Sequence, residues 1–209
     1  MSFLVVTIGR EYGSGGYDIG KKLAEKMNIA FFDKEILTRA AKESGISKGI
    51  LENHDEKTGS NYLFALADGV SYSAESAGFG LGMPLNHRVF LAQFDAITKI
   101  ASEGPCVIVG RCGDYVLKER PNIIRFFLYA DVEARIRRIM ALEKITHIQA
   151  KDMVRRVDKQ RQNYYNFFAD GNWGQRRNYD LMLRTEGLTV DEAADLLAAY
   201  IRERKNLES

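Results

Sequence analysis

The stretch that decides the fold is Phe3-Leu4-Val5-Val6-Thr7-Ile8-Gly9-Arg10-Glu11-Tyr12-Gly13-Ser14-Gly15-Gly16. Residues 3–8 are an apolar run typical of a buried strand, and from Asp18 the chain continues with the period of an amphipathic helix. A strand, a glycine-rich loop and a helix in succession can hold polyphosphate, because loop N–H groups and the helix N-terminus point at the same anion. The sequence therefore predicts that a phosphate group is bound by Gly9, Gly13, Ser14, Gly15 and Gly16.

The loop departs from the Walker A pattern in its spacing and in one residue. Walker A has four residues between its glycines, followed by lysine and a serine or threonine. Here five residues separate Gly9 from Gly15, and Gly16 stands where the phosphate-binding lysine is expected. Arg10 is the nearest cation that could replace that lysine. The alternative is a glycine-rich turn without a ligand, although several glycines close together cost backbone entropy that a plain turn does not require.

Composition bounds the class of protein. The chain has 209 residues, of which 45% are hydrophobic and 28% are charged, as expected for one globular domain. The formal net charge of +2 is too small for bulk attraction to nucleic acid, so we expect small anionic ligands and no nucleic-acid partner. The chain could be a monomer or a homodimer.

Cysteines, histidines and the N-terminus give no sign of a metal site or of export. Cys106 and Cys112 fit neither a zinc knuckle nor a redox pair, and the three histidines, at positions 54, 87 and 147, lack metal-ligand spacing. We therefore expect reduced thiols and no protein-held metal. No signal peptide or membrane-spanning run is visible, so we expect a cytoplasmic protein without a membrane partner.

Strand and helix patterns alternate along the chain. Strands are predicted at 29–32, 106–109, 123–129 and 179–183, and helices at 34–43, 86–102, 132–144, 146–168 and 189–204. Asp131 is placed to cap the helix that begins at Val132, and Thr146 and Gln149 have the spacing of a capping box. Such alternation predicts an α/β protein with a parallel sheet covered by helices on both faces.

The segment 44–85 breaks this alternation, because it contains many glycines and serines. Long segments of this kind in a compact domain are usually functional or disordered, and the aromatic and methionine content here argues against disorder. We interpret it as an inserted, partly helical segment over the site that contacts the acceptor; the alternative is a surface excursion.

Polar residues follow several of the predicted strands. Ligands of open parallel sheets bind outside the carboxyl ends of the strands. A Gly-Arg pair occurs there twice, as Gly9-Arg10 and Gly110-Arg111, and Asp33 follows another strand. Because the planar guanidinium group pairs with phosphate bidentately, Arg10 and Arg111 are candidate ligands of one anion.

A second basic cluster lies on the two late helices. Arg155, Arg156, Asp158 and Arg161 follow a helix that carries its own arginines at 135, 137 and 138. Such residues can form a solvated face with ion pairs between neighbouring turns. They can also belong to a mobile lid that brings arginines onto a transferred phosphoryl group and excludes water. We predict that 132–168 is such a helical lid.

Together these features resemble the cytidylate kinase-like family among the P-loop nucleoside monophosphate kinases. The resemblance covers nearly the whole chain and rests on Ile8 to Gly16, Asp158-Lys159-Gln160-Arg161, Tyr164-Tyr165, Trp173-Gly174 and Asn178-Tyr179-Asp180-Leu181. It implies one domain with a three-layer P-loop fold, in which a parallel sheet is flanked by helices.

The resemblance also implies roles for individual residues. The glycine loop would bind the phosphates of ATP with Mg²⁺, Arg39, Arg111 and Arg161 would face the acceptor phosphate, and Asp158 would lie near the acceptor's sugar. Asp33 is a further substrate-binding candidate, and Arg10, Arg111 and Arg161 are the catalytic candidates. Cys112 and Tyr129 stand where true cytidylate kinases have aspartates that hold the acceptor.

Three functions are compatible with the sequence. The first is an ATP-dependent phosphotransferase that acts on a small phosphorylated or hydroxylated acceptor, with a nucleoside monophosphate as the expected class. The second is a nucleotide-binding regulatory module with weak or no catalysis, which Gly16 favours. The third is RNA binding through residues 155–165, which lacks a basic excess over the whole chain.

Overall fold

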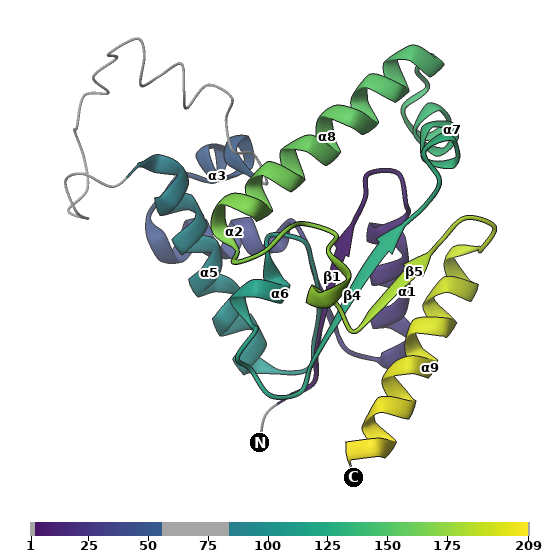
Figure 1. The fold of residues 1–209 in the computed structure, drawn as a ribbon. Helices are drawn as coiled ribbons and strands as arrows, with labels where there is room; N and C mark the ends of the chain where they lie inside the picture. Colours follow the sequence, from purple (N-terminus) through teal and green to yellow (C-terminus); the bar gives the residue numbers. More distant parts are fainter. Residues whose placement is uncertain (1–2, 56–83, 209) are drawn as a thin grey trace.

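A computed structural model gives the structure of residues 3–55 and 84–208 (Figure 1). Its elements in chain order are β1 (Val5–Arg10), α1 (Gly16–Met27), β2 (Ala30–Phe32), α2 (Glu35–Ser44), α3 (Lys48–His54), α5 (Leu85–Glu103), β3 (Cys106–Val109), α6 (Gly113–Val116), β4 (Ile123–Tyr129), α7 (Val132–Glu143), α8 (His147–Phe168), the 3₁₀ turn η1 (Arg176–Asn178), β5 (Leu181–Arg184) and α9 (Val190–Glu208).

The five strands form one parallel sheet in the order β2-β3-β1-β4-β5. The first strand of the chain is therefore central, with β3 on one side and β4 on the other. Residues of β1 and β3 are buried almost without interruption, as expected for strands covered on both faces. The predicted α/β class with a helix-flanked parallel sheet is confirmed.

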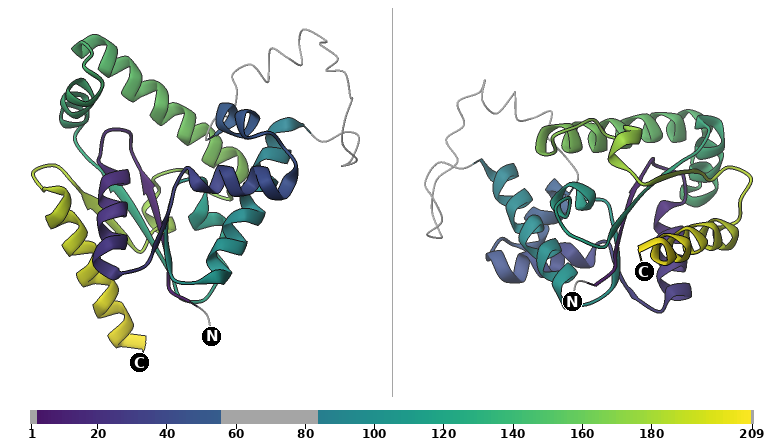
Figure 2. Two further views of the ribbon diagram at one scale, coloured as in Figure 1. Left: turned by 180° about the vertical axis from the view of Figure 1, so that it is seen from behind. Right: turned by 60° about the horizontal axis from the view of Figure 1, so that its bottom comes forward.

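Two apolar cores cover the two faces of the sheet. On one face, Val6 and Ile8 pack with α1 and α9, which contribute Leu23 and Leu197 among others. On the opposite face, Val5 packs with α2 and α5, including Leu37 and Ile97. The three layers are visible in Figure 2, where α1 and α9 lie on one side of the sheet and α2 and α5 on the other.

The end of β1 differs from the sequence prediction. The strand runs from Val5 to Arg10 rather than from 3 to 8, because its ladder with β4 continues through Gly9 opposite Phe127 and Arg10 opposite Leu128. Gly9 is required there for packing: a Cβ atom at this position would lie 2.8 Å from a ring carbon of Phe127. Gly9 therefore belongs to the strand, and the loop is shorter than the glycine pattern suggests.

Helix starts agree with the capping signals. The Asp131 side chain accepts a hydrogen bond of 2.9 Å from the N–H of Glu133 at the start of α7. Thr146 and Gln149 form the expected capping box at the start of α8. A short helix that the sequence did not indicate, α6, follows β3.

The two segments with predicted special roles have different outcomes. In the predicted insertion 44–85, the structure contains α3 and the start of α5, whereas residues 56–83 lie outside the described residues. The predicted lid consists of α7 and α8, and α8 crosses above the carboxyl ends of the strands (Figure 1). This arrangement places α8 on the side where the glycine loop ends.

Candidate functional site

A tight loop joins β1 to α1 at the carboxyl end of the sheet. The Ser14 side chain is buried, and its hydroxyl donates to the Glu11 carbonyl oxygen at 2.8 Å, which closes the loop on itself. Gly13 and Gly15 have φ values of 83° and 84°, in the left-handed region that favours glycine. Gly15 is the N-cap of α1, and no side chain caps this helix. The helix N-terminus is thus presented by backbone alone, as an anion site requires.

A cleft of about 530 Å³ opens above this loop, a size typical of small-molecule sites. The loop and the first turn of α1 line one end, and the start of α2 with Asp55 lines the other. From the lid helices, Arg138, Ile139 and Arg161 reach the cleft. The predicted loop, strand-end and lid regions therefore meet in one cleft.

Arg138 lies directly above the start of α1. A Cβ atom on Gly15 would lie 3.2–3.3 Å from the atoms of its guanidinium group. The same group pairs with Asp18 at 2.6 Å, and both side chains are partly exposed. A cation at a helix N-terminus is unfavourable unless negative charge lies beside it. Asp18 supplies that charge here, and a phosphate between Arg138 and the helix could supply it as well.

Arg10 lies against Gly16. A Cβ atom on Gly16 would lie 2.6 Å from Arg10 Cβ and 2.8 Å from its Cγ. The aliphatic part of Arg10 therefore occupies the space that a side chain at position 16 would need. Glycine at position 16 leaves room for the Arg10 side chain.

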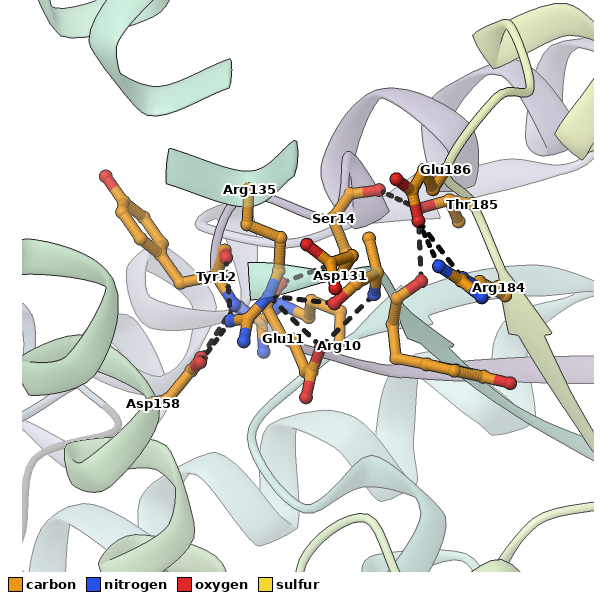
Figure 3. A network of polar contacts seen from close by, with 12 residues as sticks. Arg10, Glu11, Tyr12, Ser14, Asp131, Arg135, Asp158, Arg184, Thr185 and Glu186 are labelled. Atoms are coloured by element: carbon orange, nitrogen blue, oxygen red, sulfur yellow. Dashed lines mark hydrogen bonds and ion pairs between the residues drawn. The ribbon is translucent and has the colours of Figure 1, made fainter. Parts of the chain in front are cut away.

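A buried polar network ties the loop to the lid helices (Figure 3). Arg135 of α7 pairs with Asp158 of α8 and with Glu11. It also donates to the Tyr12 carbonyl oxygen at 3.2 Å, while the Tyr12 N–H donates to Asp158 Oδ1 at 2.7 Å. Burial raises the pKa of Glu11, and the charge of Arg135 opposes this shift. Asp158, expected near the acceptor's sugar, thus holds the loop backbone in this structure.

Arg161 reaches the loop from α8. Its Nη1 donates to the Arg10 carbonyl oxygen at 3.2 Å, and its guanidinium carbon lies 5.6 Å from the centre of the Tyr12 ring. Arg155, by contrast, is exposed on the same helix. Asp158 and Arg161 therefore both contact the backbone of the glycine loop from α8.

Arg111 is buried between two carboxylates. Its Nη1 pairs with Asp33 and its Nη2 with Asp55, each at 2.7 Å, and its side chain is 2% exposed. The backbone around it is unusual, since Gly110, Arg111 and Cys112 have φ values of 78°, 52° and 54° in succession. Such conformations are costly for residues with side chains and are common at functional sites. The left-handed turn directs Arg111 into the ion pairs.

Arg39 lies apart from the other candidates. Its guanidinium group pairs with Glu103 at 2.8 Å and with Glu43 at 3.7 Å, near the end of α5. The residues that line the cleft do not include it. Its contact with an acceptor phosphate stays a prediction.

A second cavity of about 20 Å³, enough for one water molecule, lies behind the cleft. Thr7, Asp114, Tyr165 and Tyr179 line it, and Tyr165 donates to Asp114 at 2.8 Å. Burial raises the pKa of Asp114, although the hydrogen bond from Tyr165 opposes this shift. Three residues line both cavities, and they are the three catalytic candidates: Arg10, Arg111 and Arg161.

Within 3–55 and 84–208, no group of three or more histidine, cysteine or acidic residues is arranged to hold a metal ion. Both cysteines are buried free thiols, and burial raises the pKa of Cys106 to about 11. No helix in the part of the chain that the structure describes is long and apolar enough to span a membrane.

Sequence reasoning assigned no individual role to four residues of the site: Glu11, Asp55, Arg135 and Arg138. For the two arginines the helical spacing was a usable signal. Residues three apart lie on one face of a helix, so Arg135 and Arg138 share a face, whereas Arg137 lies on another face and is exposed. No local pattern marks Glu11 or Asp55, whose partners are distant in sequence.

The parallel sheet, the glycine loop at the first strand and the arginine-lined cleft together define a kinase-like P-loop protein. Residues 5–187 match the cytidylate kinase-like family, and the chain belongs to that family. No curated protein sequence matches it.

Solved structures agree with this fold. An uncharacterized protein from Eubacterium ventriosum ATCC 27560 is 30% identical with a TM-score of 0.71, over 96% of this chain and 99% of that one. Shikimate kinase from Acinetobacter baumannii is 14% identical with a TM-score of 0.52, over 97% and 95%. A gluconokinase from Sinorhizobium meliloti 1021 is 11% identical with a TM-score of 0.52, over 99% and 97%. The two kinases share the fold.

Proposed function

We propose that this protein is an ATP-dependent phosphotransferase that moves the γ-phosphoryl group to a small acceptor. The observation that carries the proposal is the meeting of a bare helix N-terminus, at Gly15, with the guanidinium groups of Arg10, Arg138 and Arg161 in one cleft. Phosphoryl transfer depends on positioning and charge neutralisation, and these groups can provide both.

The donor would be ATP with Mg²⁺. The loop N–H groups and the start of α1 would hold its phosphates, with Arg138 and Arg10 beside them. Phosphate oxygens and water molecules would supply most of the magnesium ligands, as is usual for this ion. The Ser14 hydroxyl donates its hydrogen to the Glu11 carbonyl oxygen, which leaves the oxygen lone pairs of Ser14 as the atoms that could face the ion.

A second candidate is a nucleotide-binding regulatory module that does not catalyse transfer. It is favoured by Gly16, since a lysine there would follow the charge of the moving phosphoryl group. The two functions differ in turnover, so ATP binding without ADP release for any acceptor would favour this candidate. The cytoplasmic location and a monomeric or homodimeric state remain part of the proposal.

Binding at the loop is tested with a pair of glycine substitutions. Gly15→Ala places a side chain at positive φ and against Arg138, whereas Gly45→Ala imposes the same backbone strain, at φ 71°, where no atom lies within 4 Å. We expect both variants to lose roughly 1–2 kcal/mol of stability. Calorimetry with Mg·ATP should show wild-type affinity for Gly45→Ala and a loss of at least about tenfold for Gly15→Ala. Equal affinity in both variants would exclude the loop from the site.

A further inference from the structure

The two ends of the cleft differ in charge. Around the loop, Arg10, Arg138 and Arg161 are matched in number by Glu11, Asp18 and Glu143, and the N-terminus of α1 adds positive potential there. The far end lies around the start of α2 and the left-handed turn at Gly110–Cys112. Three carboxylates line it, from Asp33, Glu35 and Asp55, and two cations, from Lys34 and Arg111. A negatively charged donor is attracted to the first end, and the second end repels a further anion.

Arg111 does not offset the negative charge of the far end for an incoming ligand, because its own charge is already paired. Asp33 and Asp55 each hold one of its terminal nitrogens at 2.7 Å, and the side chain is 2% exposed. An acceptor phosphate near Arg111 would compete with two carboxylates that already neutralise its charge, and displacing either one would leave that carboxylate uncompensated. Arg39, the other cation expected to face an acceptor phosphate, pairs with Glu103 instead.

The small cavity behind Arg111 is lined by hydroxyl groups as well as by Arg10, Arg111 and Arg161. Thr7 is 1% exposed, and its Oγ1 makes no hydrogen bond with any described residue. Tyr165 and Tyr179 line the same cavity, and the Asp114 carboxyl accepts from Tyr165. A buried hydroxyl without a partner favours a neutral polar group or water beside it. The Thr7 hydroxyl can therefore hydrogen-bond a hydroxyl group of a ligand that reaches this cavity.

We propose that the acceptor is a neutral polyhydroxylated compound, of the sugar or nucleoside class, rather than a nucleoside monophosphate. The inference rests on the proposed function and revises the acceptor that the family resemblance implies. Carboxylates are acceptors of hydrogen bonds, so Asp33 and Asp55 can hold hydroxyl groups while Arg111 orients both carboxylates.

The transfer step balances with this chemistry. The acceptor hydroxyl oxygen attacks the γ-phosphorus of ATP and forms a new P–O bond. The bond from that phosphorus to the β,γ-bridging oxygen breaks, and its electron pair leaves on ADP. The hydroxyl proton passes to the Asp33 carboxylate, which lies at the end of β2 beside the cleft.

The test is binding of phosphate at the far end, which requires no turnover. The protein is first saturated with Mg·ADP and then titrated by calorimetry with inorganic phosphate, with cytidine and cytidine monophosphate, and with ribose and ribose 5-phosphate. The variants are Asp55→Asn, Asp33→Asn and the control Glu52→Gln. Glu52 lies on α3 near Asp55, but it pairs with Lys48 on the exposed surface.

We expect the wild type and Glu52→Gln not to bind inorganic phosphate at millimolar concentration, and to bind no phosphorylated compound more tightly than its neutral partner. Asp55→Asn or Asp33→Asn should raise phosphate affinity at least tenfold, because Arg111 then has one carboxylate fewer. A thermal midpoint confirms that the variant compared is folded. The proposal is overturned if the wild type prefers the phosphorylated compound tenfold, or if neither folded variant gains phosphate affinity.

Failure of the proposed function gives a different result. In that case Mg·ADP and Mg·ATP would not bind. The phosphate titrations would then be repeated with variants that also carry Gly15→Ala, in which the loop is altered. The effect of Asp55→Asn on the phosphate affinity of Gly15→Ala still shows whether the carboxylate of Asp55 opposes phosphate binding.

Discussion

The side chain of Arg10 lies over the backbone of Gly16, so that a Cβ atom at position 16 would lie 2.6 Å from Arg10 Cβ. The two positions are therefore coupled: a side chain at 16 and the arginine at 10 exclude each other. A lysine at position 16 therefore requires Arg10 to move.

We predict that Gly16→Lys alone lowers stability by about 1–3 kcal/mol and gives no gain in turnover, because overpacking forces Arg10 or α1 to move. In Arg10→Gly the obstructing atoms are gone, and Gly16→Lys should then cost less. The measurement is a double-mutant cycle by urea unfolding, followed by ADP release. Additive losses in the cycle would show that the two residues do not compete for space.

Arg10→Ala tests the phosphate role of the same arginine. If its guanidinium group neutralises developing charge, turnover should fall by about 10²–10³, as for other preorganised donors. The stability of Arg10→Ala should change little, because the smaller alanine side chain still fits beside Gly16. An unimpaired enzyme would remove Arg10 from the catalytic set.

Arg161 and Arg155 form a matched pair on α8. Arg161 donates to the loop and lines the cleft, whereas Arg155 is exposed. We expect Arg161→Ala to lower turnover by about a hundredfold or more, while Arg155→Ala keeps the wild-type rate and a stability within about 0.5 kcal/mol. The measurements are steady-state turnover and the thermal midpoint. Wild-type turnover in both variants would make α8 a charged surface rather than a lid.

The Arg135–Asp158 pair should couple the loop to the lid helices. The two side chains are only 9% and 17% exposed, so removing one partner leaves the other charge largely buried. We predict a loss of about 3 kcal/mol for Arg135→Ala and a coupling energy of about 1–3 kcal/mol with Asp158→Ala. The exposed Arg138–Asp18 pair is the control and should couple by less than about 1 kcal/mol. Similar coupling in both pairs would contradict a special role for the buried network.

Asp180 gives a prediction on pH. Burial tends to raise its pKa, but the hydrogen bonds from Arg125 and Arg204 outweigh burial and hold the pKa below its ordinary value of 3.8. A lowered carboxyl pKa adds stability that is complete above the pKa of the unfolded chain and is lost as pH falls through the folded pKa.

We therefore expect Asp180→Asn to lower the free energy of unfolding by about 1–3 kcal/mol at pH 7. The difference from wild type should shrink as pH falls from 5 to 3. The surface carboxylate Glu25, whose pair with Lys22 is exposed, is the control, and Glu25→Gln should have little effect. A difference that grows toward low pH would contradict the assigned shift.

The sequence by itself determined the elements whose signals are local. The strands at Cys106–Val109 and Ile123–Tyr129 were predicted at their observed bounds, because each follows a proline-containing break and is a compact apolar run. The caps at Asp131 and Thr146 were predicted for the same reason, since a cap contacts only residues two or three positions away. From this alternation of elements the parallel sheet and the position of its ligand edge follow.

Only the tertiary structure decided what the charged residues of the site do. Arg111 was expected to face a phosphate, but Asp33, 78 positions away in the chain, and Asp55, 56 away, hold it. Asp158 was expected near a sugar, but it binds the N–H of Tyr12, 146 positions away. Charged side chains reach several ångströms and take whichever opposite charge the fold brings near. Which charges those are depends on how the helices pack across the sheet, and no local pattern encodes that packing.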